Sequence, residues 1–200
     1  TEAISKHTSM KVIGLCNVPM FIKRKIAEAF NVPDEEIDFD YVGLNHLSWF
    51  TDIRISGKTV LKNLLEEGIK IKLANMSDFP VDDYLVKTTG FFPSPYLKYY
   101  YHHDSILKEQ LKDDITRAEK VMEIEKKLLE LYKDPSLTEK PKELEERGGA
   151  CYSRAAFSII SSILNNKGEK HVINIPNAGI YIDLPSDAII ETPVKLYSSG

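Results

Sequence analysis

The first third of the chain changes within a few residues from a continuous apolar run to apolar positions spaced three and four apart. The continuous run predicts a short buried strand over residues 11–15. The wider spacing predicts a helix over residues 19–30 that begins at Pro19, because proline is well suited to the first turn of a helix. Cys16 and Asn17 fall between these two elements. Ligands of α/β proteins bind just outside the carboxyl end of a strand, so we expect chemistry at this turn.

The rest of the chain mixes strand-like and helix-like patterns, and the fold class that we predict is α+β. The apolar seam of the longest predicted helix comprises Leu107, Leu111, Ile115, Ala118, Met122, Leu128, Leu129 and Tyr132. The expected elements are a short helix at 1–8, strands at 38–44 and 48–55 with a turn at 56–58, a helix at 59–65 stopped by Gly68, a loop-rich stretch at 74–90, one long helix at 105–133, an exposed helix or linker at 139–147, a helix at 153–164, and strands at 171–175 and 189–196.

Composition and charge argue against several classes of partner. With 42% hydrophobic and 28% charged residues, the chain is typical of a folded globular domain. A net charge of −4 argues against nucleic acid or an anionic membrane surface as the main partner. No apolar run approaches the roughly 20 residues that span a bilayer. The two cysteines, Cys16 and Cys151, fit a reducing cytosol, so we expect a cytoplasmic location.

The ends of the chain suggest that it was cut from a longer polypeptide. It opens on Thr1 without an initiator methionine and stops at Gly200 directly after a strand-like run. Two hundred residues are enough for one domain with a core. We therefore expect residues 1–200 to be one domain of a larger protein.

Cys16 and His46 form a candidate metal pair. A thiolate and an imidazole suit a borderline divalent ion such as Zn²⁺, Fe²⁺ or Mn²⁺. Two protein ligands would leave positions open for substrate oxygens, as a catalytic metal site requires. The alternative is that Cys16 is a small buried apolar residue. The wide spacing of the pair is not that of a zinc finger.

Asn17 and Asn45 flank the pair, and each suits either a hydrogen bond to a sugar hydroxyl or a turn. Tyrosines are concentrated at residues 96–101. They suit a packed aromatic seam or, for one of them, a general base whose pKa is lowered by a nearby cation.

Two arginines are candidates for binding an anion. Arg117 lies among acidic residues and suits either surface ion pairing or phosphate binding. Arg147, which precedes Gly148, either holds an anion or is solvated. We interpret His102 and His103 as the start of a helix. The sequence contains no Gly-x-Gly-x-x-Gly, Walker, Gly-x-Ser-x-Gly or His-Glu-x-x-His motif.

Five motifs occur in the order in which family 4 glycoside hydrolases carry them, and the chain most resembles the 6-phospho-β-glucosidases of that family. The resemblance spans essentially the whole chain. The motifs are Ile13-Gly14-Leu15-Cys16-Asn17-Val18-Pro19, Tyr41-Val42-Gly43-Leu44-Asn45-His46-Leu47-Ser48, Pro95-Tyr96-Leu97-Lys98-Tyr99-Tyr100, Thr116-Arg117-Ala118-Glu119-Lys120-Val121-Met122 and Arg147-Gly148-Gly149-Ala150-x-Tyr152-Ser153.

In that family, a Rossmann domain that binds NAD precedes these motifs. The resemblance therefore implies that residues 1–200 are the substrate- and metal-binding domain, similar to the C-terminal domain of lactate and malate dehydrogenases, with the NAD-binding domain absent. It implies that Cys16 and His46 hold Mn²⁺ or another divalent metal. It also implies that Asn17 contacts the substrate at the metal, and that Arg117 meets the substrate phosphate or the cofactor side of the cleft.

The resemblance implies that Tyr96 is the catalytic base, with Tyr99 or Tyr100 as alternatives because the preceding loop varies in length. The implied reaction is NAD-dependent oxidation of the sugar at C3, removal of the C2 proton and elimination of the aglycone, which is an exception to the two-carboxylate mechanism of most glycosidases. Asn17 stands where the α-specific branch typically carries Asp, which favours β-glycosides.

The implied partner is a phosphorylated disaccharide or aryl glycoside, and the expected assembly is a homo-oligomer, a dimer or a tetramer. Two alternatives stay open. One is a 6-phospho-α-glycosidase or α-galacturonidase of the same family. The other is a catalytically silent fragment that serves only folding or oligomerisation.

Overall fold

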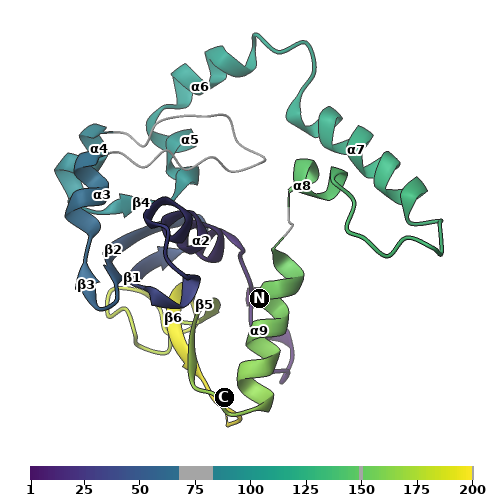
Figure 1. Cartoon of the computed structure of the whole chain (residues 1–200). Coiled ribbons are helices and arrows are strands. Elements are labelled where there is room, and N and C mark those ends of the chain that lie inside the picture. The colour runs from purple at the N-terminus through teal and green to yellow at the C-terminus, as the bar shows by residue number, and fades with distance from the viewer. Residues whose placement is uncertain (68–82, 149–150, 200) are drawn as a thin grey trace. The chain divides into compact units, whose positions relative to one another are not determined.

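The structure, a computed structural model, describes residues 1–67, 83–148 and 151–199, and Figure 1 shows its helices and strands. The chain divides into two compact units. The first unit comprises Thr1–Ile69, Val81–Leu97 and Cys151–Gly200, and the second comprises Lys70–Pro80 and Lys98–Ala150. Helices and strands are both present, which confirms the α+β fold class.

The first unit contains every strand and most of the helices of the described ranges. Its elements are α1 (Glu2–His7), α2 (Val18–Phe30), η1 (Asp34–Glu36), β1 (Ile37–Leu44), β2 (Leu47–Ile55), β3 (Lys58–Thr59), α3 (Leu61–Glu67), α4 (Asp83–Thr89), β4 (Phe92–Pro93), η2 (Pro95–Leu97), α9 (Tyr152–Leu164), β5 (Glu169–Pro176) and β6 (Ile189–Leu196). The second unit holds α5 (Lys98–Tyr101), α6 (His103–Gln110), α7 (Arg117–Leu131) and α8 (Glu143–Arg147). None of the helices in the described ranges has both the length and the apolar content to cross a membrane.

The main sheet has the order β1-β2-β3, and β4 pairs with Trp49 and Phe50 of β2, on the same edge that β3 occupies farther along the strand. Residues alternate along β1, so that Phe39 and Tyr41 are buried while Asp38 and Asp40 are exposed. Both aromatic rings meet the ring of Phe50 edge-on, with centroids 4.9 Å apart. This geometry is favourable for aromatic pairs, and it forms the core on one face of the sheet.

A second sheet consists of the antiparallel hairpin β5-β6, and α9 packs against it. Ile159 of α9 packs with Ile173 and Leu196 in a buried apolar cluster. Figure 1 shows this hairpin beside α9, and β6 also lies next to β1 of the main sheet. The hairpin therefore links the helix to the larger sheet.

The predicted strand over residues 11–15 is wrong. Within the described ranges this segment forms only an isolated antiparallel bridge between Gly14 and Asn174. The backbone hydrogen bonds of that bridge run in both directions, at 2.9 and 2.8 Å. Apolar residues alone cannot make a strand without a neighbouring strand along their length.

The predicted single helix over residues 105–133 is also wrong. α6 ends at Gln110 and α7 begins at Arg117, because Thr116 forms a capping box with Glu119. Of the predicted seam, Leu128 is buried, whereas Leu129 is 59% exposed. The apolar positions therefore do not form one continuous buried stripe.

In the predicted loop at residues 74–90, residues 74–82 lie outside the described ranges, as does Gly68. Residues 83–89 form α4, which the sequence analysis did not expect. The other predicted elements are found, with ends shifted by a few residues. They include α2 with its left-handed C-cap at Asn31, the hairpin β1-β2, the exposed helix α8, and α9.

The β1-β2 hairpin requires a glycine at position 43, because of both its backbone conformation and the space around it. The φ of Gly43 is +139°, and a Cβ there would lie 2.3 Å from the carbonyl oxygen of Leu47. We expect Gly43→Ala to lower the free energy of unfolding by about 3 kcal/mol. Gly57→Ala is the matched control, because its φ is also positive but no atom lies within 4 Å, and we expect it to cost about 1 kcal/mol. Urea titration followed by the fluorescence of Trp49 measures both, and equal costs would contradict the steric argument.

Candidate active site

Three segments of the first unit that are far apart in the sequence converge on the side chain of Glu191 in β6. Glu191 is 1% exposed. One carboxylate oxygen accepts hydrogen bonds from the amide nitrogens of Asn45 at 2.9 Å and Asn174 at 3.0 Å. The other accepts a hydrogen bond from the hydroxyl of Tyr41 at 2.5 Å. These bonds tie together the β1-β2 hairpin and the β5-β6 hairpin.

Cys16 is brought to this cluster by the extended segment before α2. Gly14 pairs with Asn174, the residue directly opposite Glu191 across the hairpin. A Cβ at Gly14 would lie 2.9 Å from the Cβ of Asn174, so the close approach requires glycine. The Cys16 side chain is buried, and the nearby side chain of Asn45 acts to lower the pKa of its thiol. Burial raises the pKa of the Cys16 thiol, and the charge of Glu191 acts in the same direction.

His46 lies in the two-residue turn that joins β1 to β2, with the pair Leu44 and Leu47 closing the turn. Its φ is 66°, a left-handed conformation that histidine adopts more readily than most residues. Burial lowers the pKa of His46, although the charge of Glu191 opposes this effect. The imidazole is therefore neutral at pH 7, which is the form that binds a metal.

The ring of Tyr96 stacks on the ring of His46, with centroids 3.8 Å apart and planes inclined by 10°. Tyr96 lies in η2, directly after β4. The other tyrosines of the predicted seam belong to the second unit and are exposed, Tyr100 by 79%. The tyrosine cluster is therefore not a packed seam, and only Tyr96 contacts a predicted metal ligand within the first unit.

Asn17 is the N-cap residue of α2, but its side chain makes no capping hydrogen bond to that helix. Its carbonyl oxygen accepts the first helical hydrogen bond, from Phe21 at 2.9 Å. The backbone of Asn17 thus starts the helix, and the carboxamide is not used as a cap. The side chain of Asn45, in contrast, donates a hydrogen bond to Glu191.

Arg117 and Arg147 lie in the second unit and make contacts inside it. Arg117 donates from Nη2 to the carbonyl oxygens of Glu146 and Arg147, at 2.7 and 3.2 Å. Arg147 forms an ion pair with Glu125 at 3.0 Å. The contacts of the two arginines therefore join α7 to α8. His102 is the N-cap of α6 and His103 its first residue, as predicted.

The sequence analysis missed Glu191, Tyr41 and Tyr152 as members of the site. Burial raises the pKa of Tyr152, and so do the charges of Cys16, Tyr96 and Glu191. The sequence does carry a signal for Glu191, which is a charged residue inside the apolar strand predicted at residues 189–196. Charged residues are rarely buried unless they are paired, so a carboxylate at such a position indicates a specific role. Tyr152 belongs to one of the five motifs, although no role was given to it.

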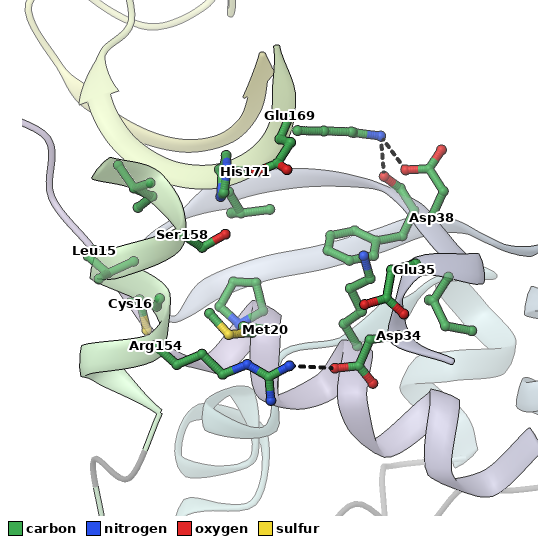
Figure 2. A pocket seen from close by; sticks show the side chains of 18 residues that line it. Leu15, Cys16, Met20, Asp34, Glu35, Asp38, Arg154, Ser158, Glu169 and His171 are labelled. Carbon is green, nitrogen blue, oxygen red and sulfur yellow. Dashed lines mark hydrogen bonds and ion pairs between the residues drawn. The ribbon is translucent and has the colours of Figure 1, made fainter. Parts of the chain in front are cut away.

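A cavity of about 500 Å³ adjoins the site and is shown in Figure 2. Of the predicted site residues, all of which lie in the described ranges, Cys16 alone lines it. Its charged side chains are largely paired with one another. Arg154 reaches Asp34 at 4.0 Å, and Lys170 reaches Asp38 at 2.9 Å. The cavity therefore offers no surplus positive charge for a phosphate.

Cys16 and His46 are the side chains of this site best suited to hold a divalent metal. Across the described ranges, no group of three or more His, Cys, Asp or Glu side chains is arranged to bind a metal. Two ligands of the kinds that borderline divalent ions accept are present, and the carboxylate of Glu191 lies beside them. This donor set fits a catalytic ion whose other positions are filled by substrate and water.

Comparison with known proteins gives consistent results. The sequence profile of the family 4 glycosyl hydrolase C-terminal domain matches residues 41–200. The chain is 37% identical to a 6-phospho-β-glucosidase of Escherichia coli over 210 aligned positions, and 36% identical to a probable 6-phospho-β-glucosidase of Bacillus subtilis over 208. In both cases the alignment covers 100% of this chain and 47% of the relative.

Among solved structures, the fold matches the 6-phospho-β-glucosidase of Thermotoga maritima, which was determined with manganese, NAD⁺ and glucose-6-phosphate. The TM-score is 0.84 at 35% identity, over 100% of this chain and 47% of that chain. The chain thus spans about half the length of the relatives that it matches.

The burial of Cys16 predicts a slow, pH-dependent reaction of its thiol in the metal-free chain. A raised pKa leaves less thiolate at pH 7, and the thiolate is the reactive form. We expect iodoacetamide to modify Cys16 more slowly than the partly exposed Cys151, with a rate that keeps rising as the pH passes the ordinary thiol range. Peptide mapping by mass spectrometry measures both rates, and Cys151→Ser isolates Cys16. Equal rates at pH 7 in the folded chain, as expected in urea, would contradict the burial of Cys16.

Proposed function

Because the chain belongs to glycosyl hydrolase family 4, we propose that it is the substrate- and metal-binding domain of a 6-phospho-β-glucosidase. The identity of 36–37% over the whole chain to relatives with that name supports this substrate class. Asn17, at the position where the α-specific branch typically carries Asp, favours the β-linked substrate. The observation that carries most weight is the Tyr96 ring stacked on His46.

The relatives are about twice as long as this chain, which supports a larger parent protein. We propose that residues outside this chain contribute most of the NAD site, since the sequence contains no dinucleotide-binding motif. When bound, NAD⁺ supplies a hydride acceptor, and Mn²⁺ or another divalent ion polarises substrate oxygens. The fragment alternative, a silent folding module, finds no support in the matches to complete enzymes.

Cys16 and His46 would hold the divalent ion in this proposal. The neutral imidazole of His46 offers a lone pair at pH 7, and the buried thiol of Cys16 loses its proton when the cation binds. The stacked Tyr96 ring fixes the plane of the imidazole. His46 would offer its nitrogen from the β1-β2 turn and Cys16 its sulfur from the segment before α2, with no third protein ligand in the described ranges.

Tyr96 would remove the proton at C2 of the sugar through its phenolic oxygen. A base must lie within hydrogen-bond reach of the proton that it takes, and the stack keeps the tyrosine beside the metal ligands. This pairing explains why the site needs a tyrosine and a thiol where most glycosidases carry two carboxylates.

The carboxamides of Asn17 and Asn45 would hydrogen-bond sugar hydroxyls beside the metal. Arg117 and Arg147 are proposed to meet the phosphate group of the substrate. Among the described residues of the second unit, Arg117 makes its hydrogen bonds through Nη2, so its other donors suit a phosphate. The substrate would be a phosphorylated disaccharide or aryl glycoside. Because phosphorylated sugars arise on uptake, we propose a cytoplasmic location.

Hydrolysis in D₂O tests the proposed function. We expect the full-length protein to cleave an aryl 6-phospho-β-glucoside only when both NAD⁺ and Mn²⁺ are present. Because the C2 proton exchanges with solvent after removal, deuterium should appear at C2 of the glucose-6-phosphate product. Mass spectrometry and NMR of the product measure this label. Turnover without NAD⁺, or product without deuterium at C2, would contradict the mechanism.

Two tyrosine variants serve as the matched pair in this assay. We expect Tyr96→Phe to lower kcat by about 10²-fold or more, the usual contribution of a general base. Tyr100→Phe removes the same hydroxyl from an exposed side chain of the second unit and should leave kcat unchanged. The reverse result would transfer the role of base to Tyr100. Preferential cleavage of the α-linked substrate would favour the α-glycosidase alternative.

The full-length protein is also proposed to form a homo-oligomer, a dimer or a tetramer. Large apolar side chains are exposed on both units, among them Leu129 on α7 and Phe157 on α9. Burying such surface between copies is favourable. Sedimentation velocity of the full-length protein is expected to give the mass of a dimer or tetramer. A monomer across the micromolar range would contradict this expectation.

A further inference from the structure

Glu191 is a buried charge without a cationic partner. It is 1% exposed, and across the described ranges no lysine or arginine forms an ion pair with it. Its hydrogen-bond donors are the neutral side chains of Tyr41, Asn45 and Asn174. Three hydrogen bonds offset part of the desolvation cost of a carboxylate, but a buried charge is normally paired with a cation or bound to a metal.

The carboxylate also determines the orientation of two carboxamides. An ionised carboxylate only accepts hydrogen bonds, so a carboxamide beside it must present its NH₂ group. Asn45 and Asn174 both do so, through Nδ2. The second amide hydrogen of Asn45 suits the nearby sulfur of Cys16, whose pKa the Asn45 side chain acts to lower. The Oδ1 atom of Asn45 is then left to accept a hydrogen bond from a ligand hydroxyl.

The two proposed metal ligands lie within the electrostatic influence of this carboxylate. Burial is the main cause of the raised pKa of Cys16 and of the lowered pKa of His46. The Glu191 charge adds to the first shift and opposes the second. Neither ligand is joined to Glu191 by a hydrogen bond. Glu191 therefore acts on the pair through space and through Asn45.

We propose that Glu191 is a positioning residue of this site: its carboxylate orients Asn45 and supplies the buried negative charge that a divalent cation on Cys16 and His46 neutralises. This inference rests on the proposed function, because it requires the metal pair. It adds a specific role for a residue outside the five family motifs. Loss of such an outer partner typically weakens metal binding 10- to 100-fold.

The substitution Glu191→Gln separates the charge from the hydrogen bonds. The Gln oxygen can accept from Asn45 and Asn174 as before. Its NH₂ group can donate to the hydroxyl of Tyr41, which then donates to Oγ of Ser48, at 2.6 Å in the structure. The variant keeps the shape and bonding of the site but loses the charge. A buried charge without a cation destabilises the metal-free protein, so its removal should not lower stability.

The experiment is a Co²⁺ titration of the metal-free full-length protein, in which the thiolate-to-cobalt absorption band reports binding at Cys16. We expect Glu191→Gln to raise the dissociation constant for Co²⁺ about 10- to 100-fold. The thermal midpoint of the metal-free variant should equal or exceed that of the wild type. A residue with a merely structural role would show the opposite pattern, with lowered stability and unchanged affinity.

Three variants complete the design. Glu28→Gln removes the same charge from the exposed surface of α2 and should bind Co²⁺ as the wild type does. Cys16→Ser should abolish the absorption band. Glu191→Asp keeps the charge but withdraws it from Asn45, and its affinity should lie between those of the wild type and Glu191→Gln.

The outcomes separate this inference from the proposed function. A wild-type band together with an unchanged dissociation constant in Glu191→Gln overturns the role of Glu191 and leaves the metal site standing. A metal-free Glu191→Gln protein that melts below the wild type also overturns it. A wild-type protein that gives no band overturns the proposed metal site, and the role of Glu191 with it.

Discussion

The buried carboxylate of Glu191 is the interaction on which the geometry of the site depends. Because a buried charge must be hydrogen-bonded, Tyr41, Asn45 and Asn174 are held around it. Asn174 in turn pairs through its backbone with Gly14, two residues before Cys16. The β1-β2 turn and the β5-β6 hairpin are therefore joined by the Glu191 side chain, and the segment that carries Cys16 is joined to them by the backbone bridge to Asn174.

The position of Tyr96 follows from a second, shorter-range constraint. β4 pairs with β2 at Trp49 and Phe50, and the backbone of Ser94 donates to the carbonyl oxygen of Ser48 at 2.8 Å. η2 therefore starts beside the β1-β2 turn, and Tyr96 meets His46. Pairing by backbone hydrogen bonds sets this register independently of the aromatic stack.

The sequence predicted the elements that depend on local patterns and missed those that depend on distant partners. α2 was predicted because Pro19 marks its start and its apolar residues are spaced three and four apart, and the two strands that flank the turn at His46 were predicted from their own patterns. The prediction of a strand at residues 11–15 was wrong because, in the described ranges, Gly14 is the one residue of this segment that pairs with another strand. The prediction of one long helix was wrong because the capping box at Thr116 starts a new helix, although the apolar spacing continues across this position. The contact of His46 with Tyr96 joins residues whose spacing follows no motif rule, so only the structure reveals it.

Arg117 and Arg147 differ in how their contacts within the second unit leave them able to bind a phosphate. Arg117 caps the end of α8 through one nitrogen, which satisfies carbonyl groups that a helix C-terminus leaves without partners. A guanidinium carries five N–H donors, so Nε and Nη1 remain for a second, planar acceptor such as a phosphate. Arg147 forms an ion pair with Glu125. Because both side chains are exposed, this pair contributes little to stability, and a doubly charged anion can replace Glu125. Of the two, Arg117 is therefore held in one orientation by the fold, and a pre-oriented guanidinium loses less entropy when it binds a phosphate.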